Sequence, residues 1–167
     1  MTVLEVSPGA KLSVCVMAWK SDPLDAVAAE LPEARVVCAD IRDAAAVKEA
    51  VAAARSAAGP ITVLVNNAGM RSYGRFGEFS RKDFERSVAV NLAAPFFASQ
   101  AVVPIMRAQG GGHVIHMASQ LGIVASRYGA VYNLTKAGLI QLTRSMALEL
   151  SAEGIRVNAV CPGPVST

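Results

Sequence analysis

The sequence predicts an α/β protein with a doubly wound parallel sheet, made of about five strands and four helices. Two observations lead to this fold class. Short β-branched segments alternate along the chain with longer segments of helical periodicity, as in consecutive βαβ units. The composition, with 53% hydrophobic and 17% charged residues, suits strands that helices cover on both faces. A length of 167 residues fits a single domain.

Apolar and β-branched runs predict strands at residues 12–18, 34–39, 61–66, 113–118 and 155–160. The segment Thr2–Val6 also has β-forming residues, and Ser7-Pro8-Gly9-Ala10 connects it to the strand at 12–18. A parallel neighbour needs a crossover of about a dozen residues or more. The short connection therefore allows Thr2–Val6 only to pair antiparallel with the strand at 12–18 or to stay disordered.

Helical periodicity predicts helices at residues 23–31, 43–58, 80–108 and 130–153. Asp22-Pro23 is a suitable start for the first, because an Asp side chain caps free amides and Pro fits the first turn. Within the third, Pro95 has no amide hydrogen and cannot satisfy the carbonyl of Asn91, four residues before it. The helix should bend there, and the freed carbonyl can hold a water molecule.

Charge and apolar run lengths argue against two classes of partner. The net charge of +3 comes from 16 basic and 13 acidic residues spread along the chain, so nucleic acid is not expected to bind. Uninterrupted apolar stretches fall far short of the ~18 to 20 residues that span a bilayer. Glu5, Pro8 and Lys11 interrupt the beginning of the chain, unlike a signal peptide. We therefore expect a cytoplasmic protein without a membrane partner.

The cysteines and histidines do not predict a metal site. Cys15, Cys38 and Cys161 lie in or beside apolar runs, where a thiol is usually a small buried hydrophobe. Their odd number and the absence of CxxC spacing argue against a disulfide framework or a zinc site. His113 and His116 alternate along one strand without a third ligand at metal spacing, so we assign them to packing or to the surface.

Three side chains point to proton transfer. Tyr132 and Lys136 lie four residues apart at the start of a predicted helix, so they share one face. Ser119 directly follows the strand at 113–118, at the carboxyl edge where such sheets bind ligands. A phenol is a weak acid, and a nearby ammonium favours its ionised form. Taken alone, the Tyr–Lys spacing is equally compatible with an exposed Tyr and a solvated Lys.

Further motifs agree with the catalytic reading of these three residues. In chain order they are Ala39-Asp40-Ile41, Asn66-Asn67-Ala68-Gly69, Asn91, Ser119, Tyr132-Asn133-Leu134-Thr135-Lys136 and Pro162-Gly163-Pro164-Val165-Ser166-Thr167. With them, the sequence resembles the short-chain dehydrogenase/reductase (SDR) family from about residue 12 to its end. The resemblance implies a Rossmann-like fold and NAD(P)-dependent hydride transfer to or from a small alcohol or carbonyl. It assigns catalysis to Asn91, Ser119, Tyr132 and Lys136.

The same resemblance implies a cofactor-binding surface. Asp40 and Ile41 would meet the adenine, and Asn67, Ala68 and Gly69 the adenosine side. Tyr132 and Lys136 would lie at the nicotinamide ribose. The nicotinamide end would be held by Pro162, Gly163, Val165 and Thr167. The strand at 12–18 ends without an Asp or Glu and Lys20 follows it, which favours NADP over NAD slightly.

The sequence departs from the family at both ends. A Gly-rich turn that holds the cofactor pyrophosphate normally follows the first strand, but here only Gly9 precedes the strand at 12–18. The chain also stops at Thr167, before the family's substrate region. We therefore expect a truncated, incomplete domain. Two functions stay open: an oxidoreductase, or a non-catalytic remnant that acts only through subunit association.

Two structural expectations follow from the family resemblance. The missing first strand would lie between the strands at 12–18 and 61–66, so Thr2–Val6 is the local candidate to fill this gap. The helices at 80–108 and 130–153 carry apolar residues on more than one face. Matching helices of the family pack between subunits, which predicts a homodimer or a homotetramer.

Overall fold

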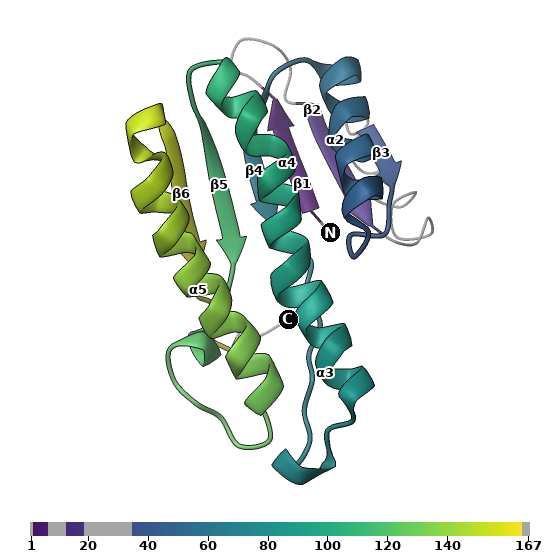
Figure 1. Ribbon diagram of the computed structural model, residues 1–167, viewed down its shortest axis with the longest axis vertical. Coiled ribbons are helices and arrows are strands. Elements are labelled where there is room, and N and C mark those ends of the chain that lie inside the picture. The colour runs from purple at the N-terminus through teal and green to yellow at the C-terminus, as the bar shows by residue number, and fades with distance from the viewer. Residues whose placement is uncertain (1, 7–12, 19–34, 165–167) are drawn as a thin grey trace.

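Six strands form one sheet in the order β3-β2-β1-β4-β5-β6 (Figure 1). The computed structural model describes residues 2–6, 13–18 and 35–164. In chain order the strands are β1 (Thr2–Val6), β2 (Ser13–Ala18), β3 (Arg35–Cys38), β4 (Ile61–Asn66), β5 (Gly112–Met117) and β6 (Ile155–Val160). The five strands predicted from apolar runs are all present, with their ends shifted by one residue at most.

The strand β1 lies antiparallel to both of its neighbours. It pairs with β2, Thr2 lying opposite Met17, and with β4, Thr2 lying opposite Asn66. The other neighbouring pairs, β2 with β3, β4 with β5 and β5 with β6, are parallel. The predicted antiparallel pairing is confirmed, and Thr2–Val6 fills the expected gap. The prediction of a parallel sheet is therefore wrong at β1. The connection from β1 to β2 is too short for the crossover that a parallel pair needs.

Three helices lie on one face of the sheet: α2 (Ala44–Ala58), α4 (Ala94–Ala108) and α5 (Ala130–Leu150), as Figure 1 shows. Asp43 begins α2 by accepting hydrogen bonds from the amides of Ala45 and Ala46. The main core lies between these helices and the sheet, and its fully buried side chains include Val47, Ile61, Leu64, Val102, Met106, Val114 and Ile155. The helix predicted at 23–31 falls outside the described residues.

The predicted helix at 80–108 is one helical run in three parts. It starts with α3 (Arg81–Val88), capped by the Ser80 hydroxyl, continues through the π-helical turn η2 (Ala89–Ala93) and ends with α4. The Ala94 amide donates to the carbonyl of Ala89, five residues back. The irregularity thus lies where Pro95 predicted a bend, and it takes the form of a π-bulge. Such bulges are frequent at functional sites.

The same run, Arg81–Ala108, is the one described helix that is long and apolar enough to cross a membrane by length and composition alone. Its most apolar window of 18 residues has a mean hydropathy of 1.6. The uninterrupted apolar stretches of the sequence are much shorter and did not indicate such a window. Ala98, Val102 and Met106 are buried on α4 and belong to the core that covers β4 and β5. Packing of a core helix accounts for this composition.

Two local expectations need correction. The last predicted helix ends at Leu150 rather than Glu153, and residues Ser151–Glu153 form a 3-10 turn before β6. Glu153 there accepts hydrogen bonds from the guanidinium of Arg107, which ties this turn to the end of α4. Cys38 is exposed rather than buried, because β3 is an edge strand and the thiol lies at its end.

Candidate active site

The side chain of Lys136 is almost completely buried between α5 and the end of β5. Its Nζ donates to the backbone carbonyl of Met117 at 2.6 Å, and only 4% of the residue is exposed. Burial lowers the pKa of the Lys136 ammonium because the charged form loses hydration, while the nearby Cys161 acts in the opposite direction. The lysine is thereby fixed at the carboxyl edge of the sheet.

Tyr132 lies one helical turn before Lys136, and its ring is half-buried. The Lys136 Nζ lies 5.8 Å from the centroid of this ring, within the range of a cation–π contact. The ring of Tyr73 stacks on that of Tyr132, with centroids 6.0 Å apart and planes 24° apart. Both contacts involve the ring and leave the phenol hydroxyl available for chemistry.

Asn91 is fully buried in the π-helical turn. Its Oδ1 accepts from the amide of Met70 at 2.8 Å, and its Nδ2 donates to the Met70 carbonyl at 2.9 Å and to Thr135 Oγ1 at 3.1 Å. A β-carbon at Gly69 would lie 3.5 Å from both Asn91 Oδ1 and Lys136 Nζ. Asn91, Gly69 and Lys136 are therefore neighbours, although they come from three different segments.

Ser119 follows β5 and begins a 3-10 turn, Gln120–Gly122. Its hydroxyl accepts a hydrogen bond from the amide of Leu121 at 3.1 Å, and 8% of the residue is exposed. The turn packs directly on α5, where a β-carbon at Gly122 would lie 2.7 Å from the backbone carbonyl carbon of Lys136. Only glycine permits this close approach, which keeps the turn after Ser119 on the helix that carries Tyr132 and Lys136.

Two of the residues predicted at the nicotinamide end lie against the same turn. The amide of Gln120 donates to the carbonyl of Pro162 at 3.0 Å. A β-carbon at Gly163 would lie 3.1 Å from Gln120 Oε1. Pro162 and Gly163 thus adjoin the segment that begins at Ser119. Val165 and Thr167 lie outside the described residues, as does Lys20.

The predicted adenine end lies after β3. Both carboxylate oxygens of Asp40 accept from Nε of Arg42, at 2.9 and 3.1 Å, and the Arg42 guanidinium holds the pKa of that carboxyl below its usual value. Ile41 is partly buried against the main core. Asn67 and Gly69 are exposed and Ala68 is half-buried, directly after β4. Their contacts with a cofactor stay a prediction.

His116 is a buried polar residue next to this site. It lies opposite Asn66 in the parallel pairing of β5 with β4, and its Nδ1 is 3.1 Å from Asn66 Nδ2. Burial lowers the pKa of His116 to about 4, and the charge of Lys136 acts in the same direction. The ring is therefore neutral at pH 7. Its assignment to packing accounts for the burial and not for the polar contact.

Sequence reasoning missed three contacts at the site. Thr135 accepts from Asn91, Met70 binds both ends of the Asn91 amide, and Tyr73 stacks on Tyr132. Thr135 directly precedes Lys136 in the sequence, and this position could have identified it as a site residue. Met70 contributes only backbone atoms, so no sequence pattern could reveal its contact. Tyr73 is an exposed loop residue whose neighbours depend on the fold.

The family model described as short chain dehydrogenase matches residues 6–167. The chain belongs to this family. Among its relatives, oxidoreductase UcpA of Salmonella typhimurium is 39% identical over 152 residues, which is 88% of this chain. A second relative, 2-(R)-hydroxypropyl-CoM dehydrogenase of Xanthobacter autotrophicus, is 38% identical over 78% of this chain. The same organism has a relative named inactive 2-(S)-hydroxypropyl-CoM dehydrogenase 2, which is 40% identical over 78% of this chain.

Solved structures agree with the family. A short-chain dehydrogenase from Streptomyces avermitilis matches 92% of this SDR chain with a TM-score of 0.87 and 30% identity. A short-chain alcohol dehydrogenase from Sinorhizobium meliloti, described as putative, matches 92% with a TM-score of 0.88 and 30% identity. The chain spans 58% of the S. typhimurium relative and 58% of the S. avermitilis structure. It therefore corresponds to somewhat more than half of these proteins.

Proposed function

We propose that this chain carries the proton-transfer centre of an oxidoreductase that moves a hydride between NAD(P) and a small alcohol or carbonyl. The observation that carries the proposal is the grouping of Tyr132 and Asn91 around the buried ammonium of Lys136. Lys136 Nζ lies near the Tyr132 ring, and Gly69 adjoins both this Nζ and the Asn91 amide. These groups come from α5, η2 and the segment after β4, so only the fold assembles them.

In the proposed reaction the protein residues handle the proton. The Ser119 hydroxyl donates a hydrogen bond to the substrate oxygen, and Tyr132 gives its hydroxyl proton to that oxygen in reduction or takes it in oxidation. The ammonium of Lys136 stabilises the phenolate that remains after proton donation. The nicotinamide, when bound, supplies or accepts the hydride.

The nicotinamide-ribose end fits the donors that the chain offers. An ammonium has three N–H donors, and the described contacts of Lys136 use one of them on Met117. One of the two remaining donors suits a hydroxyl of a ribose. Tyr132, Lys136, Pro162 and Gly163 would hold this end. The fit supports a nicotinamide nucleotide at this end. Among the described residues, no group of three or more His, Cys, Asp or Glu could hold a metal ion.

The pyrophosphate end fits less well. Because β1 is antiparallel to β4, its last residue, Val6, lies beside Ile61 at the beginning of β4. The last residue of β1 therefore lies at the opposite end of the sheet from Ser119, which follows the carboxyl end of β5. This arrangement supports the alternative function, a non-catalytic remnant. It also predicts that the affinity for a dinucleotide depends on contacts with the nicotinamide end and the adenine end of the cofactor.

Titration with NADPH and NADH, followed by nucleotide fluorescence, tests the proposed function. We expect NADPH to bind more tightly than NADH. Replacing Lys136 by methionine should weaken NADPH binding by roughly tenfold or more, because a charge-assisted hydrogen bond is worth about 1.5 to 3 kcal/mol. Lys82→Met, at an exposed position on α3, is the matched control and should bind as the unaltered chain does. If neither nucleotide binds at millimolar concentration, the non-catalytic alternative is correct.

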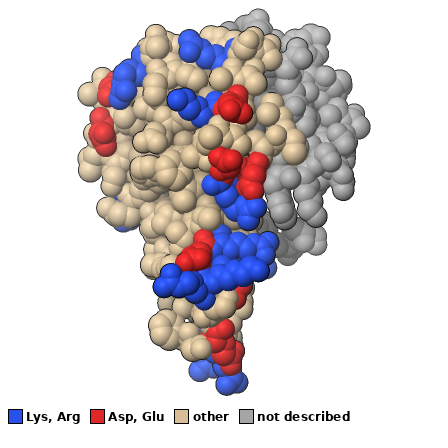
Figure 2. All heavy atoms as spheres, turned by 45° about the vertical axis from the view of Figure 1, so that its right-hand side comes forward, with Lys and Arg blue, Asp and Glu red and all other residues tan. Residues whose placement is uncertain are grey.

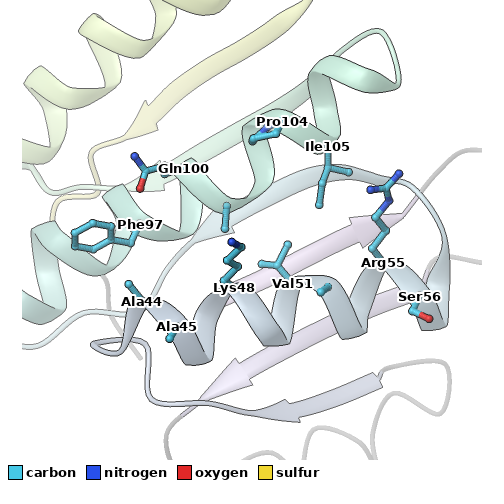
Figure 3. Close-up of a pocket in the computed structure, with 12 residues that line it drawn as sticks. Ala44, Ala45, Lys48, Val51, Arg55, Ser56, Phe97, Gln100, Pro104 and Ile105 are labelled. Atoms are coloured by element: carbon cyan, nitrogen blue, oxygen red, sulfur yellow. The ribbon is translucent and has the colours of Figure 1, made fainter.

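We also propose that α4 and α5 mediate association into a homodimer or homotetramer. Phe96, Phe97 and Leu148 are 44%, 40% and 83% exposed on these helices. An open groove of about 990 Å³ lies between α2 and α4, lined by apolar side chains such as Phe97 and Ile105 together with the basic side chains of Lys48 and Arg55 (Figure 3). On the face in Figure 2, basic and acidic side chains lie next to one another in small mixed groups, and uncharged areas separate these groups.

Light scattering at micromolar concentration tests this association. We expect a mass of two or four chains, and Leu148→Glu should shift the mass toward one chain because it puts a charge into an apolar contact. Ile123→Glu changes another exposed apolar residue, 70% exposed, outside these helices and should leave the mass unchanged. A monomeric unaltered chain would refute the proposal.

A further inference from the structure

A buried chain of hydrogen bonds links β5 to the beginning of α4. The Ser99 hydroxyl donates to the carbonyl of Pro95 at 2.7 Å, and Asn66 Nδ2 lies 3.2 Å from Ser99 Oγ and 3.1 Å from His116 Nδ1. Asn66, Ser99 and His116 are 3%, 2% and 0% exposed. This chain of hydrogen bonds therefore runs through the protein core, one helical turn beyond the π-helical segment that holds Asn91.

The direction of every proton in this chain follows from its last member. A carbonyl only accepts, so the Ser99 hydroxyl must donate to Pro95, and Ser99 Oγ is left to accept from Asn66. An amide nitrogen carries two hydrogens and no acceptor, so Asn66 Nδ2 donates one hydrogen to Ser99 and the other to His116. His116 Nδ1 is therefore an acceptor without a proton. In a neutral imidazole the proton must then be on Nε2.

This tautomer leaves one donor without a partner. His116 Nε2 is buried, and among the described residues it is the only such side-chain nitrogen or oxygen that has no hydrogen-bond partner. An unsatisfied buried donor costs about 1 to 3 kcal/mol, and buried water is the usual remedy where polar partners surround it. The donor thus indicates a ligand atom or a water molecule that accepts a hydrogen bond.

The His116 ring is also a neighbour of Lys136. The two nitrogens of an imidazole point in widely different directions, so Nε2 points away from the Asn66 amide that contacts Nδ1. Lys136 reaches this region from α5, where its Nζ contacts the carbonyl of Met117, the residue after His116. The lysine charge also acts on the His116 ring and helps to keep it neutral. Asn91 approaches Lys136 from η2.

We propose that His116 is a positioning residue for Lys136, held as the Nε2–H tautomer so that it fixes a buried water molecule against the lysine ammonium. Water has two acceptor sites, which suit one N–H of His116 and one of Lys136. The Asn66 amide sets the tautomer of His116, and the water molecule holds the Lys136 ammonium in one orientation. The proposal rests on the proposed function only for its effect on turnover.

Nitrogen NMR of the histidine rings tests the tautomer without any substrate. At pH 7 we expect His116 to show a bare Nδ1 and a protonated Nε2. Asn66→Asp should reverse this pattern, because a carboxylate accepts where the amide donated. A protonated Nδ1 in the unaltered chain would overturn the proposal. The exposed ring of His113, two residues earlier on the same strand, provides an internal reference.

The link to Lys136 is tested with two variants that keep the size of the side chain. His116→Phe removes both nitrogens, and His116→Gln returns an N–H near the position of Nε2. We expect hydrogen exchange of the Lys136 ammonium, followed by NMR, to become roughly tenfold faster in His116→Phe and to recover in His116→Gln. His113→Phe should leave it unchanged. Equal exchange rates in His116→Phe and the unaltered chain would refute the positioning role.

Turnover separates this proposal from the proposed function. If the unaltered chain is active, His116→Phe should lower kcat roughly tenfold with little change in KM, and His116→Gln should restore most of it. Full activity in His116→Phe would overturn the positioning role and leave the oxidoreductase intact. If the unaltered chain binds no nucleotide, the proposed function fails, whereas the tautomer and the ammonium exchange still decide the role of His116.

Discussion

Replacing Tyr132 by phenylalanine is expected to lower kcat by about 10²- to 10⁴-fold, the usual contribution of a general acid or base. The change removes one hydroxyl and nothing else. Stacking on Tyr73 and the contact with Lys136 both involve the ring and persist in the variant. The affinity for NADPH should therefore stay within a factor of about three, since the lysine donors remain. Steady-state rates with small ketones and secondary alcohols provide the measurement.

Tyr128→Phe is the matched control for this prediction. Tyr128 lies four residues before Tyr132, just ahead of α5, is 54% exposed, and loses the same hydroxyl in the variant. Its kcat should equal that of the unaltered chain. A Tyr132→Phe variant with more than about a tenth of the original kcat would assign the proton transfer to another group. Loss of NADPH binding in this variant would instead indicate that the hydroxyl holds the nucleotide.

Replacing Gly111 by alanine is expected to destabilise the fold by about 3 kcal/mol or more. Gly111 has a φ of +145°, a region that residues with a β-carbon almost never adopt. A β-carbon there would also lie 2.6 Å from the carbonyl oxygen of Gly154. The obstacle is backbone, at the point where the turn after α4 meets the turn before β6, so it cannot rotate away. Urea unfolding measures the change as a lower midpoint.

Two other glycines separate the causes of this effect. Gly110 has a φ of +89° and no atom within 4 Å of a β-carbon, so Gly110→Ala should cost only about 1 to 2 kcal/mol from backbone strain. Gly77 has neither a positive φ nor a near neighbour, so Gly77→Ala should change stability by less than about 0.5 kcal/mol. If Gly111→Ala is no worse than Gly110→Ala, the turn adjusts, and the close contact with Gly154 does not restrict it.

The periodic signals in the sequence were strong enough to predict most of the fold. Strands β4 and β6 begin and end at the predicted residues, because Gly59-Pro60 and Gly154 mark the turns before them. The antiparallel direction of β1 followed from the length of one connection. The π-bulge was predicted in position but not in form. A missing amide at Pro95 specifies that a hydrogen bond is lost, and packing decides how the backbone compensates.

The site was less accessible to sequence reasoning, because its contacts depend on backbone atoms and on neighbouring strands. Lys136 binds the carbonyl of Met117, and Asn91 binds both polar atoms of the Met70 backbone, which any residue could provide. His116 was judged by its own strand, where it alternates with exposed His113. Its partner Asn66 is fifty residues away, and only the register of β4 with β5 brings them together.

The antiparallel β1 also has a consequence for the order in which the sheet folds. Pairing of β1 with β2 joins segments that are close in sequence, whereas pairing of β1 with β4 brings Val6 to Ile61. The entropy of closing a loop grows with its length, so the local pair should form first and the β1–β4 seam late. Asn66, which orients His116, lies on this seam opposite Thr2. Transient separation of the seam would therefore disturb the buried polar chain before it reached the helices.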